Sequence, residues 1–391
     1  MRSNGSSERT AVVAAAFRTP IGRVNGALAA IEPASLAAPL IRRILAETGL
    51  SPAAVDDVIL GNAANSAGNL ARLAALEAGL PVSVPGLTVD RQCGSGLEAI
   101  MLAARLVQAG AGRFYLAGGT ESASRANLRF RPPATPGGEP QPVRRARMAP
   151  DAIGDPDMGI AAENVAAHAG ISRARQDAFA LESHVRAVTA AKAGRFDDEI
   201  VPLETPAGLV FHDECPRENT SLERLAALKP VFRPDGTVTA GNACPVNDGA
   251  SVVLVTSLAA AQALGLQPLL EVVDGAVAGV DPNLLGLGPV PAMAKLAARN
   301  AGLDAANIPF VEFNEAFAAQ VLASLDALGV DPARANRDGG ALALGHPYGA
   351  SGAILVTRLF AQMRAAEAGA QGLVMMGIGG GMGIAALFRR L

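Results

Sequence analysis

Short apolar segments alternate along the chain with longer segments in which apolar residues recur every three or four positions. The short segments include five stretches of strand length: AVVAAAF (residues 11–17), VILG (58–61), FYLAGG (114–119), SVVLVTS (251–257) and GLVMMG (372–377). Uninterrupted apolar runs of this length are typical of strands that helices cover on both faces. The pattern therefore predicts an α/β fold.

Two segments far apart in the chain share one order of elements. One runs from CGSG at residue 93 to FYLAGG, and the other from YGASG at residue 348 to GLVMMG. Each contains a small-residue turn, an amphipathic helix, a link rich in Ala and Gly, and a buried strand. The repetition predicts two similar α/β halves.

The region between these segments differs in composition. From about residue 123 to 245, Pro, Arg and acidic residues become more frequent and strand-like runs become rare. We read this region as an inserted loop domain with helices near residues 159–169 and 172–193. The expected division is an N-terminal half of residues 1–122 and 246–268, the loop domain of residues 123–245, and a C-terminal half of residues 269–391.

Composition narrows the class of protein. A formal net charge of −3 gives no electrostatic reason to expect nucleic acid or an anionic membrane as a partner. Cys93, Cys215 and Cys244 form no C-x-x-C pair, so neither a disulfide framework nor a zinc ribbon is supported. No apolar run approaches the roughly 18 residues that a membrane span needs, and the polar start is a poor signal peptide. We therefore expect a soluble, cytoplasmic protein without a metal site.

One stretch is strongly basic in spite of the acidic total. Between Arg125 and Arg147 lie six arginines and a single acid, Glu139, in a run broken by prolines. Two interpretations stay open at this point, a solvated loop and a site for a small phosphorylated ligand.

A cysteine and a histidine are candidates for nucleophilic chemistry. Cys93 opens a predicted helix, where backbone N–H groups and the helix dipole favour a thiolate, and Gly94 and Gly96 leave room for a substrate. His346 precedes Pro347, which disfavours helix and suits a side chain presented from a loop. The alternatives are a small buried hydrophobe for Cys93 and a satisfied core histidine for His346.

Two further segments carry candidate site residues. Asn314 and Glu315 follow the apolar run IPFVEF, where Asn314 is either a helix N-cap or a polar group in a pocket. Five of the seven residues from 377 to 383 are glycine, so backbone or ligand must come unusually close there. Met382 breaks the G-x-G-x-x-G pattern of dinucleotide sites, and the sequence has neither a P-loop nor a G-x-S-x-G elbow.

CGSG, NEAFA, GGALALGHPYGASG and GIGGGMG, in this order, resemble the motifs of the thiolase family of coenzyme A-dependent acyltransferases. FRTPIGRVNGALA, MGIAAENVA and TAGNACPVNDGA extend the resemblance over nearly the whole chain. It implies two similar βαβαβαββ halves in five layers, α-β-α-β-α, with the active site where they meet. Family members work as homodimers or homotetramers, so we expect a homo-oligomer.

The resemblance also implies residue roles. Cys93 is expected to take the acyl group, His346 to activate it, and Asn314 to hold a water that forms an oxyanion hole with His346. A second hole would use the N–H groups of Cys93 and Gly379. Coenzyme A is then a substrate, with no permanently bound cofactor, and its channel would be lined by Arg217, Phe232, Ala240, Cys244 and Met158.

Three positions depart from the family pattern. Cys244 stands where a serine is usual, and Asp157 where a histidine is usual. The larger departure is Gly377, because the family has there a second cysteine that moves the α-proton of the nucleophilic acyl group. We therefore expect acylation to survive and the carbon–carbon step to be impaired. The alternatives are an acyltransferase or thioesterase that makes no carbon–carbon bond, and a non-catalytic acyl-CoA binder.

Overall fold

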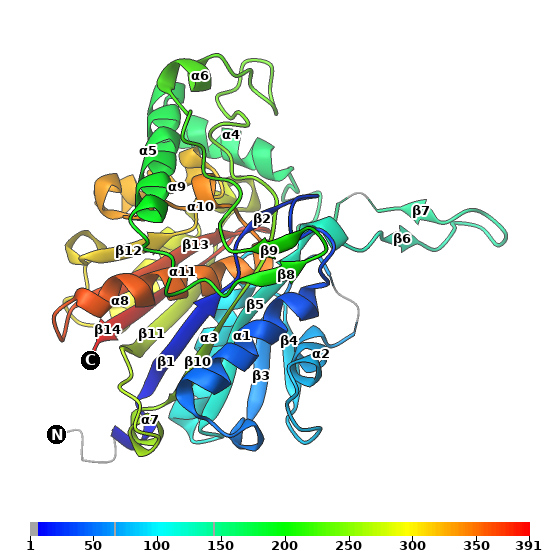
Figure 1. Ribbon diagram of the computed structural model, residues 1–391. Coiled ribbons are helices and arrows are strands. Elements are labelled where there is room, and N and C mark those ends of the chain that lie inside the picture. The colour runs from blue at the N-terminus through cyan, green and yellow to red at the C-terminus, as the bar shows by residue number, and fades with distance from the viewer. Residues whose placement is uncertain (1–6, 66–67, 144) are drawn as a thin grey trace.

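A large mixed sheet forms the centre of the molecule in the computed structural model, which describes residues 7–65, 68–143 and 145–391. Its strands follow the order β12-β13-β14-β11-β1-β10-β5-β3-β4, with β2 paired to β10 (Figure 1). The predicted α/β fold is confirmed, and each of the five apolar stretches forms a strand. The strands of this sheet are β1 (Ala11–Arg18), β2 (Gly22–Arg23), β3 (Asp57–Gly61), β4 (Gly86–Val89), β5 (Phe114–Ser122), β10 (Asn247–Ser257), β11 (Leu270–Gly279), β12 (Phe310–Phe313), β13 (Gln371–Ile378) and β14 (Met382–Arg390).

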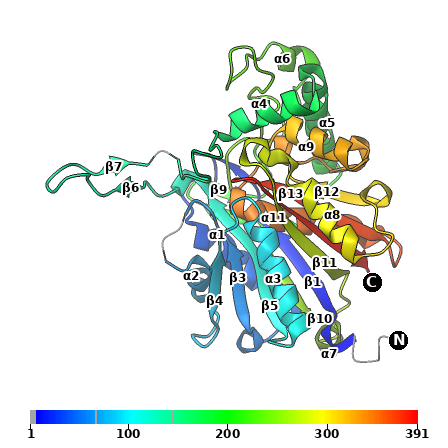
Figure 2. The same cartoon turned by 180° about the vertical axis from the view of Figure 1, so that it is seen from behind.

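Helices cover both faces of the sheet, and two of them, α3 and α11, pack between its two halves. One core cluster joins α3 and α11 to strands of both halves, a second joins α1 and α2 to the first half, and a third joins α8 and α9 to the second half. Figure 1 shows α1 on one side of the sheet and Figure 2 shows α3 on the other. This arrangement gives the five expected layers. The helices are α1 (Pro33–Thr48), α2 (Leu70–Glu77), α3 (Ser95–Ala109), α4 (Met158–Ala169), α5 (Arg173–Lys192), α6 (Leu222–Ala226), α7 (Leu258–Ala263), α8 (Pro289–Arg299), α9 (Ala318–Ala327), α10 (Ala341–Leu344) and α11 (Tyr348–Gln362).

The two halves meet along β1 and β11, which pair antiparallel over a short register. The first half runs β1, α1, β3, α2, β4, α3, β5 and β10, which is the expected βαβαβαββ order. The second half runs β11, α8, β12, α9, α11, β13 and β14, and where a third strand is expected only Ala335 forms a bridge, to Val311. The repeat is therefore shorter by one strand in the second half.

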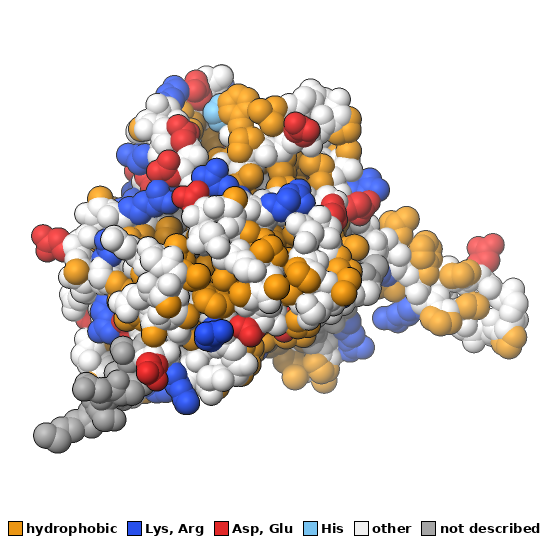
Figure 3. Space-filling model, turned by 60° about the horizontal axis from the view of Figure 1, so that its bottom comes forward, with side chains coloured by type: hydrophobic (Ala, Val, Ile, Leu, Met, Phe, Trp, Pro, Cys, Tyr) orange, Lys and Arg blue, Asp and Glu red, His pale blue; other side chains and the backbone are white. Residues whose placement is uncertain are grey.

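The segment between β5 and β10 carries helices and small hairpins. The helices expected near residues 159–169 and 172–193 are present as α4 and α5. Strands β6 (Phe130–Arg131) and β7 (Gln141–Pro142) form a hairpin arm that stands out from the body, as Figures 1 and 3 show. A second hairpin joins β8 (Leu203–Thr205) to β9 (Gly208–Val210).

The basic run between residues 125 and 147 lies on and beside this arm. Arg125 pairs with Glu32, Arg147 with Asp151, and Arg145 with both Asp155 and Asp157. Both strands of the arm are exposed. These contacts favour the solvated surface over a phosphate site among the residues named.

A network of buried charges connects the two halves to the inserted segment. Arg18 on β1 donates to Glu199 and Asp213, and Arg358 on α11 donates to Glu199 and Asp338. The side chains of Arg18, Glu199 and Arg358 are each at most 2% exposed.

No helix among the described residues is long and apolar enough to cross a membrane.

Candidate active site

The amino ends of α3 and α11 meet at the centre of the molecule. A Cβ added to Gly96 would lie 2.7 Å from the carbonyl oxygen of Gly349, and one added to Gly352 would lie 2.5 Å from the backbone nitrogen of Leu97. Only glycine permits this approach, because any side chain would displace backbone. The close packing brings the segment around Cys93 next to the segment around His346.

Cys93 lies two residues before α3 and keeps partial exposure, which access for a substrate requires. The backbone N–H groups of Gly379 and of Cys93 itself are directed at its sulfur. Burial nevertheless raises the pKa of the Cys93 thiol to about 11, outweighing these donors. The backbone N–H groups do favour the thiolate, as expected, but desolvation of the charged form has the larger effect.

We expect alkylation of Cys93 by iodoacetamide to speed up steadily with pH. The thiolate is the reactive form, so the rate should rise roughly tenfold per pH unit between about pH 7 and 9, well below a pKa near 11. The measurement is the pseudo-first-order labelling rate of Cys93 by mass spectrometry, with Cys93→Ser reporting the background from Cys215 and Cys244. A rate that levels off below pH 8 contradicts the expectation.

His346 is held as a neutral imidazole in an extended segment. It forms a parallel bridge with Val246, as expected for a residue before proline. Its backbone N–H donates to Asn247 Oδ1 at 2.9 Å. Its Nδ1 lies 2.6 Å from Ser351 Oγ, while Nε2 is buried without a hydrogen-bond partner. Burial lowers the pKa of His346 to about 4. A neutral imidazole with one free nitrogen can accept a proton from a thiol.

Asn314 follows β12 and presents a free amide. Its backbone N–H donates to Met375 of β13 at 3.0 Å, and both side-chain amide atoms are buried without a partner. The N-cap of α9 is Phe317, so Asn314 is not the helix cap and the pocket interpretation is favoured. Glu315 has a structural role instead, since its carboxylate accepts from Ser183, Asn336 and Leu342.

Gly377 lies within β13, paired with Gly383 of β14. Its φ lies outside the left-handed region, in contrast to Gly380 and Gly381, which have φ of 83° and 76° in the turn that follows. A Cβ at Gly377 would lie 3.2 Å from Gln320 Nε2 and 3.5 Å from the Leu285 carbonyl oxygen. The backbone at residue 377 can therefore accept a side chain.

Cys244 is a neighbour of Cys93 but a poor proton acceptor. Its N–H donates to the Ala316 carbonyl at 2.9 Å. Burial raises the pKa of the Cys244 thiol far above its usual range, and the nearby Cys93 raises it further. A thiol held neutral in this way is unsuited to replace a general base.

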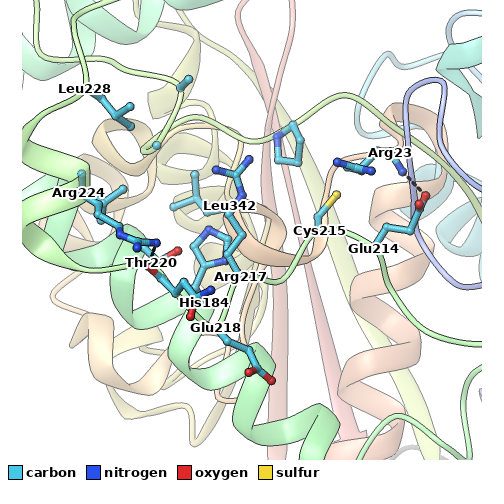
Figure 4. A pocket seen from close by; sticks show the side chains of 15 residues that line it. Arg23, His184, Glu214, Cys215, Arg217, Glu218, Thr220, Arg224, Leu228 and Leu342 are labelled. Carbon is cyan, nitrogen blue, oxygen red and sulfur yellow. Dashed lines mark hydrogen bonds between the residues drawn. The ribbon is translucent and has the colours of Figure 1, made fainter.

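A cavity of about 480 Å³ lies beside this centre, among α5, α6 and the segments around residues 215 and 241 (Figure 4). Arg217 and Ala240 line it, as do Arg23, His184 and Arg224, whereas Phe232, Met158 and Cys244 are not among its lining residues. The Arg217 N–H donates to His184 Nδ1 at 3.2 Å. Pro245, the residue that follows Cys244, also lines the cavity.

Met158 and Phe232 lie elsewhere around the centre. A Cβ at Gly379 would lie 3.7 Å from Met158 Sδ and 2.9 Å from Met148 Sδ, so both methionines cover the glycine turn. Phe232 packs edge-on against Phe317, with ring centroids 6.3 Å apart. Asp157 stands before α4 and pairs with Arg145 at the surface.

Sequence reasoning missed several residues near this centre. Tyr348 packs edge-on against His346, with ring centroids 5.4 Å apart. Burial raises the pKa of the Tyr348 hydroxyl, and Cys244 and Cys93 raise it further. Glu121 accepts from Gly349 N–H at 2.9 Å beneath the amino end of α11. A usable signal existed for Ser351 and Tyr348, since both stand within the histidine motif. No pattern in the sequence points to Glu121.

The sequence profile of the thiolase N-terminal domain matches residues 11–259, and that of the thiolase C-terminal domain matches residues 266–390. The chain belongs to the thiolase family. This thiolase is 45% identical over 382 residues to a Staphylococcus aureus protein provisionally named acetyl-CoA C-acetyltransferase VraB, covering 97% of this chain and 99% of the relative. It is also 45% identical to an acetyl-CoA acetyltransferase of Pseudomonas aeruginosa, covering 97% of this chain and 99% of that protein.

A solved structure supports the same assignment. The crystal structure of the Bacillus anthracis acetyl-CoA acetyltransferase superposes with a TM-score of 0.89 at 38% identity, covering 98% of this thiolase and 100% of that chain. The expected family and fold class are confirmed, and the protein is an acyltransferase by family.

Proposed function

We propose that this thiolase forms an acyl-enzyme on Cys93 from an acyl-CoA or a 3-ketoacyl-CoA. The observation that carries the proposal is the Gly379 N–H directed at the Cys93 sulfur, and the neutral His346 with its unpaired Nε2 supports it. Relatives named as acetyl-CoA acetyltransferases support acetyl-CoA as the donor to test first.

The first step follows from the protonation states. The Cys93 thiol is neutral and His346 Nε2 has no partner, so Nε2 takes the thiol proton as the sulfur attacks the thioester carbonyl. The proposed oxyanion hole consists of the N–H groups of Cys93 and Gly379, which are directed at the sulfur. The tetrahedral intermediate then expels the coenzyme A thiolate, which takes the proton back from His346 and leaves as the free thiol.

The 480 Å³ cavity is the proposed place of coenzyme A. Arg217, Arg224 and Arg23 line it, and guanidinium groups bind phosphate well. Glu214 lies beside Arg23, accepting from its backbone N–H at 2.9 Å (Figure 4). Coenzyme A would enter as a substrate, with no cofactor bound permanently.

The second half of the reaction is proposed to be slow. A thiolase condenses or cleaves carbon–carbon bonds with an acid–base group at the position of Gly377, and this residue has no side chain. The missing group typically costs a factor of about 10²–10⁴ in rate. The chain would then pass its acyl group to water or to another thiol, which makes a non-condensing acyltransferase or thioesterase the second candidate.

Incubation with acetyl-CoA tests the proposal. We expect an added acetyl mass on Cys93, found by peptide mass spectrometry, and no added mass in Cys93→Ser. Absence of labelling at every pH between about 6 and 9 contradicts the proposal and leaves an acyl-CoA binder. Once label is present, its loss to water compared with its transfer to added coenzyme A separates the thioesterase from the acyltransferase.

The proposed function comes with an expected compartment and an expected oligomeric state. The three cysteines are free among the described residues, which fits a reducing compartment such as the cytoplasm. By family resemblance we expect a homodimer or homotetramer, and light scattering of the purified chain would give the mass that decides between them.

A further inference from the structure

A small cavity borders Asn314 and shares no lining residue with the proposed coenzyme A cavity. Its volume is about 20 Å³, and every residue that lines it is buried. Glu312 and Asn314 contribute from the end of β12, Ser351 and Arg358 from α11, and glycines 339, 340 and 345 from the turns around α10. The rest of the lining is apolar and comes from Ile21, Ala341, Leu344, Ile354 and Leu355. A cavity of this size has room for one water, which needs roughly 10–15 Å³ and two to four polar partners.

Three of the residues that line the cavity carry polar side-chain atoms without a hydrogen-bond partner. They are Glu312 Oε2, both amide atoms of Asn314, and Arg358 Nε. The other ends of the same side chains are paired: Glu312 Oε1 accepts from Gln362 Nε2 at 2.9 Å, and Arg358 donates to Glu199 and Asp338. Buried polar atoms are rarely left unpaired, and a shared water is the usual remedy.

We propose that one ordered water in this cavity bridges Glu312 Oε2 to the Asn314 amide, which makes Glu312 the positioning residue for Asn314. The inference rests on the proposed catalytic role of Asn314. It goes beyond that role, because it assigns a function to a carboxyl group that does not touch the substrate.

The protonation state of Glu312 sets the direction of these hydrogen bonds. Burial raises the pKa of Glu312 to about 8; Asp338 and Glu315 raise it further, while Arg358 and the Gln362 hydrogen bond lower it. At neutral pH the carboxyl is therefore mostly protonated and donates to the water. The water in turn donates to Asn314 Oδ1, which leaves Asn314 Nδ2 free to donate on the active-site side.

High-resolution crystal structures of three proteins test the bridge directly. We expect wild type and Glu312→Gln to show a water within hydrogen-bond distance of residue 312 and of the Asn314 amide. Glu312→Met should lack the water and show the Asn314 amide rotated. An empty cavity in wild type, or an unmoved Asn314 in Glu312→Met, overturns the inference whatever the activity.

Turnover provides a second readout. The assay is thiolysis of acetoacetyl-CoA by coenzyme A, and each variant is compared with the wild-type rate. Glu312→Met should lose about tenfold in kcat with little change in KM, because a displaced Asn314 amide misplaces the reacting groups. Glu312→Gln should stay within about twofold at pH 7. It should also lack the fall in rate that we expect of wild type above about pH 8. An unchanged pH profile in Glu312→Gln counts against the role of the protonated carboxyl.

Acylation keeps this inference distinct from the proposed function. Cys93 should take acetyl label from acetyl-CoA in all three proteins, since the first step uses Cys93, His346 and Gly379 rather than Asn314. Loss of label in wild type refutes the proposed function alone. Retained label with an empty cavity refutes only the inference about Glu312.

Discussion

Replacing Gly377 by cysteine is expected to raise thiolysis of acetoacetyl-CoA by at least about tenfold, because it supplies an acid–base group to the strand beside the proposed nucleophile. The backbone at Gly377 lies in β13 outside the left-handed region, so the strain that a Cβ suffers at positive φ does not arise. The nearest obstacle is the flexible Gln320 amide, 3.2 Å from the added Cβ.

The buried amide of Gln320 adds to this expectation. Both of its polar atoms lack a partner, and Nε2 lies next to the space at Gly377. A cysteine sulfur there gains a polar neighbour rather than an apolar wall.

Gly377→Ala is the matched control, since it adds the Cβ without a proton-transfer group and should leave thiolysis near the wild-type rate. Thiolysis is followed as loss of the acetoacetyl-CoA absorbance at saturating coenzyme A. Brisk turnover in wild type contradicts impaired condensation. If Cys244→Ser then abolished that turnover, Cys244 would be the replacement base, against the raised pKa of its thiol.

Removing the Glu199 carboxylate should cost more stability than any change at an exposed ion pair. Glu199 accepts from both Arg18 and Arg358, and both guanidiniums also face the Phe196 ring, at 5.3 Å and 4.4 Å from its centroid. In Glu199→Ala these buried cations lose their shared partner. Breaking a buried pair in this way typically destabilises by about 3–5 kcal/mol.

Asp326→Ala is the control for this change. It breaks an ion pair with Arg175 in which both side chains are 42% exposed, and such pairs contribute about 1 kcal/mol or less. Urea unfolding midpoints at one protein concentration compare the variants. A Glu199→Ala midpoint no lower than that of Asp326→Ala would show that the buried network contributes little.

The strands and the four site motifs could be predicted because their physical causes are local. Long apolar runs bury themselves wherever they are, and glycines at residues 94 to 96 and 377 to 383 mark places where backbone comes close. The charge state of Cys93 could not be predicted in the same way. A helix terminus is visible in the sequence, whereas the desolvation that outweighs it depends on residues far along the chain.

Glu312 illustrates the same limit. Residues 312 and 314 point to one side of a strand, so the sequence contains a hint that two polar groups share a neighbourhood. That they face a cavity with Arg358 depends on how α11 crosses β12, which no short pattern in the sequence reveals. Local signals located the residues, and tertiary packing determined their protonation and partners.

The glycine contact between α3 and α11 has a mechanical consequence. Cys93 and His346 stand at the amino ends of two helices whose backbones touch, at Gly96 and Gly349. The distance between Cys93 and His346 is therefore set by the contact of helices α3 and α11 and not by the surrounding loops. Met148 and Met158, which cover the glycine turn, belong to the separate inserted segment. The residues that cover the glycine turn can thus change while the distance between Cys93, the proposed nucleophile, and His346, its proposed base, stays constant.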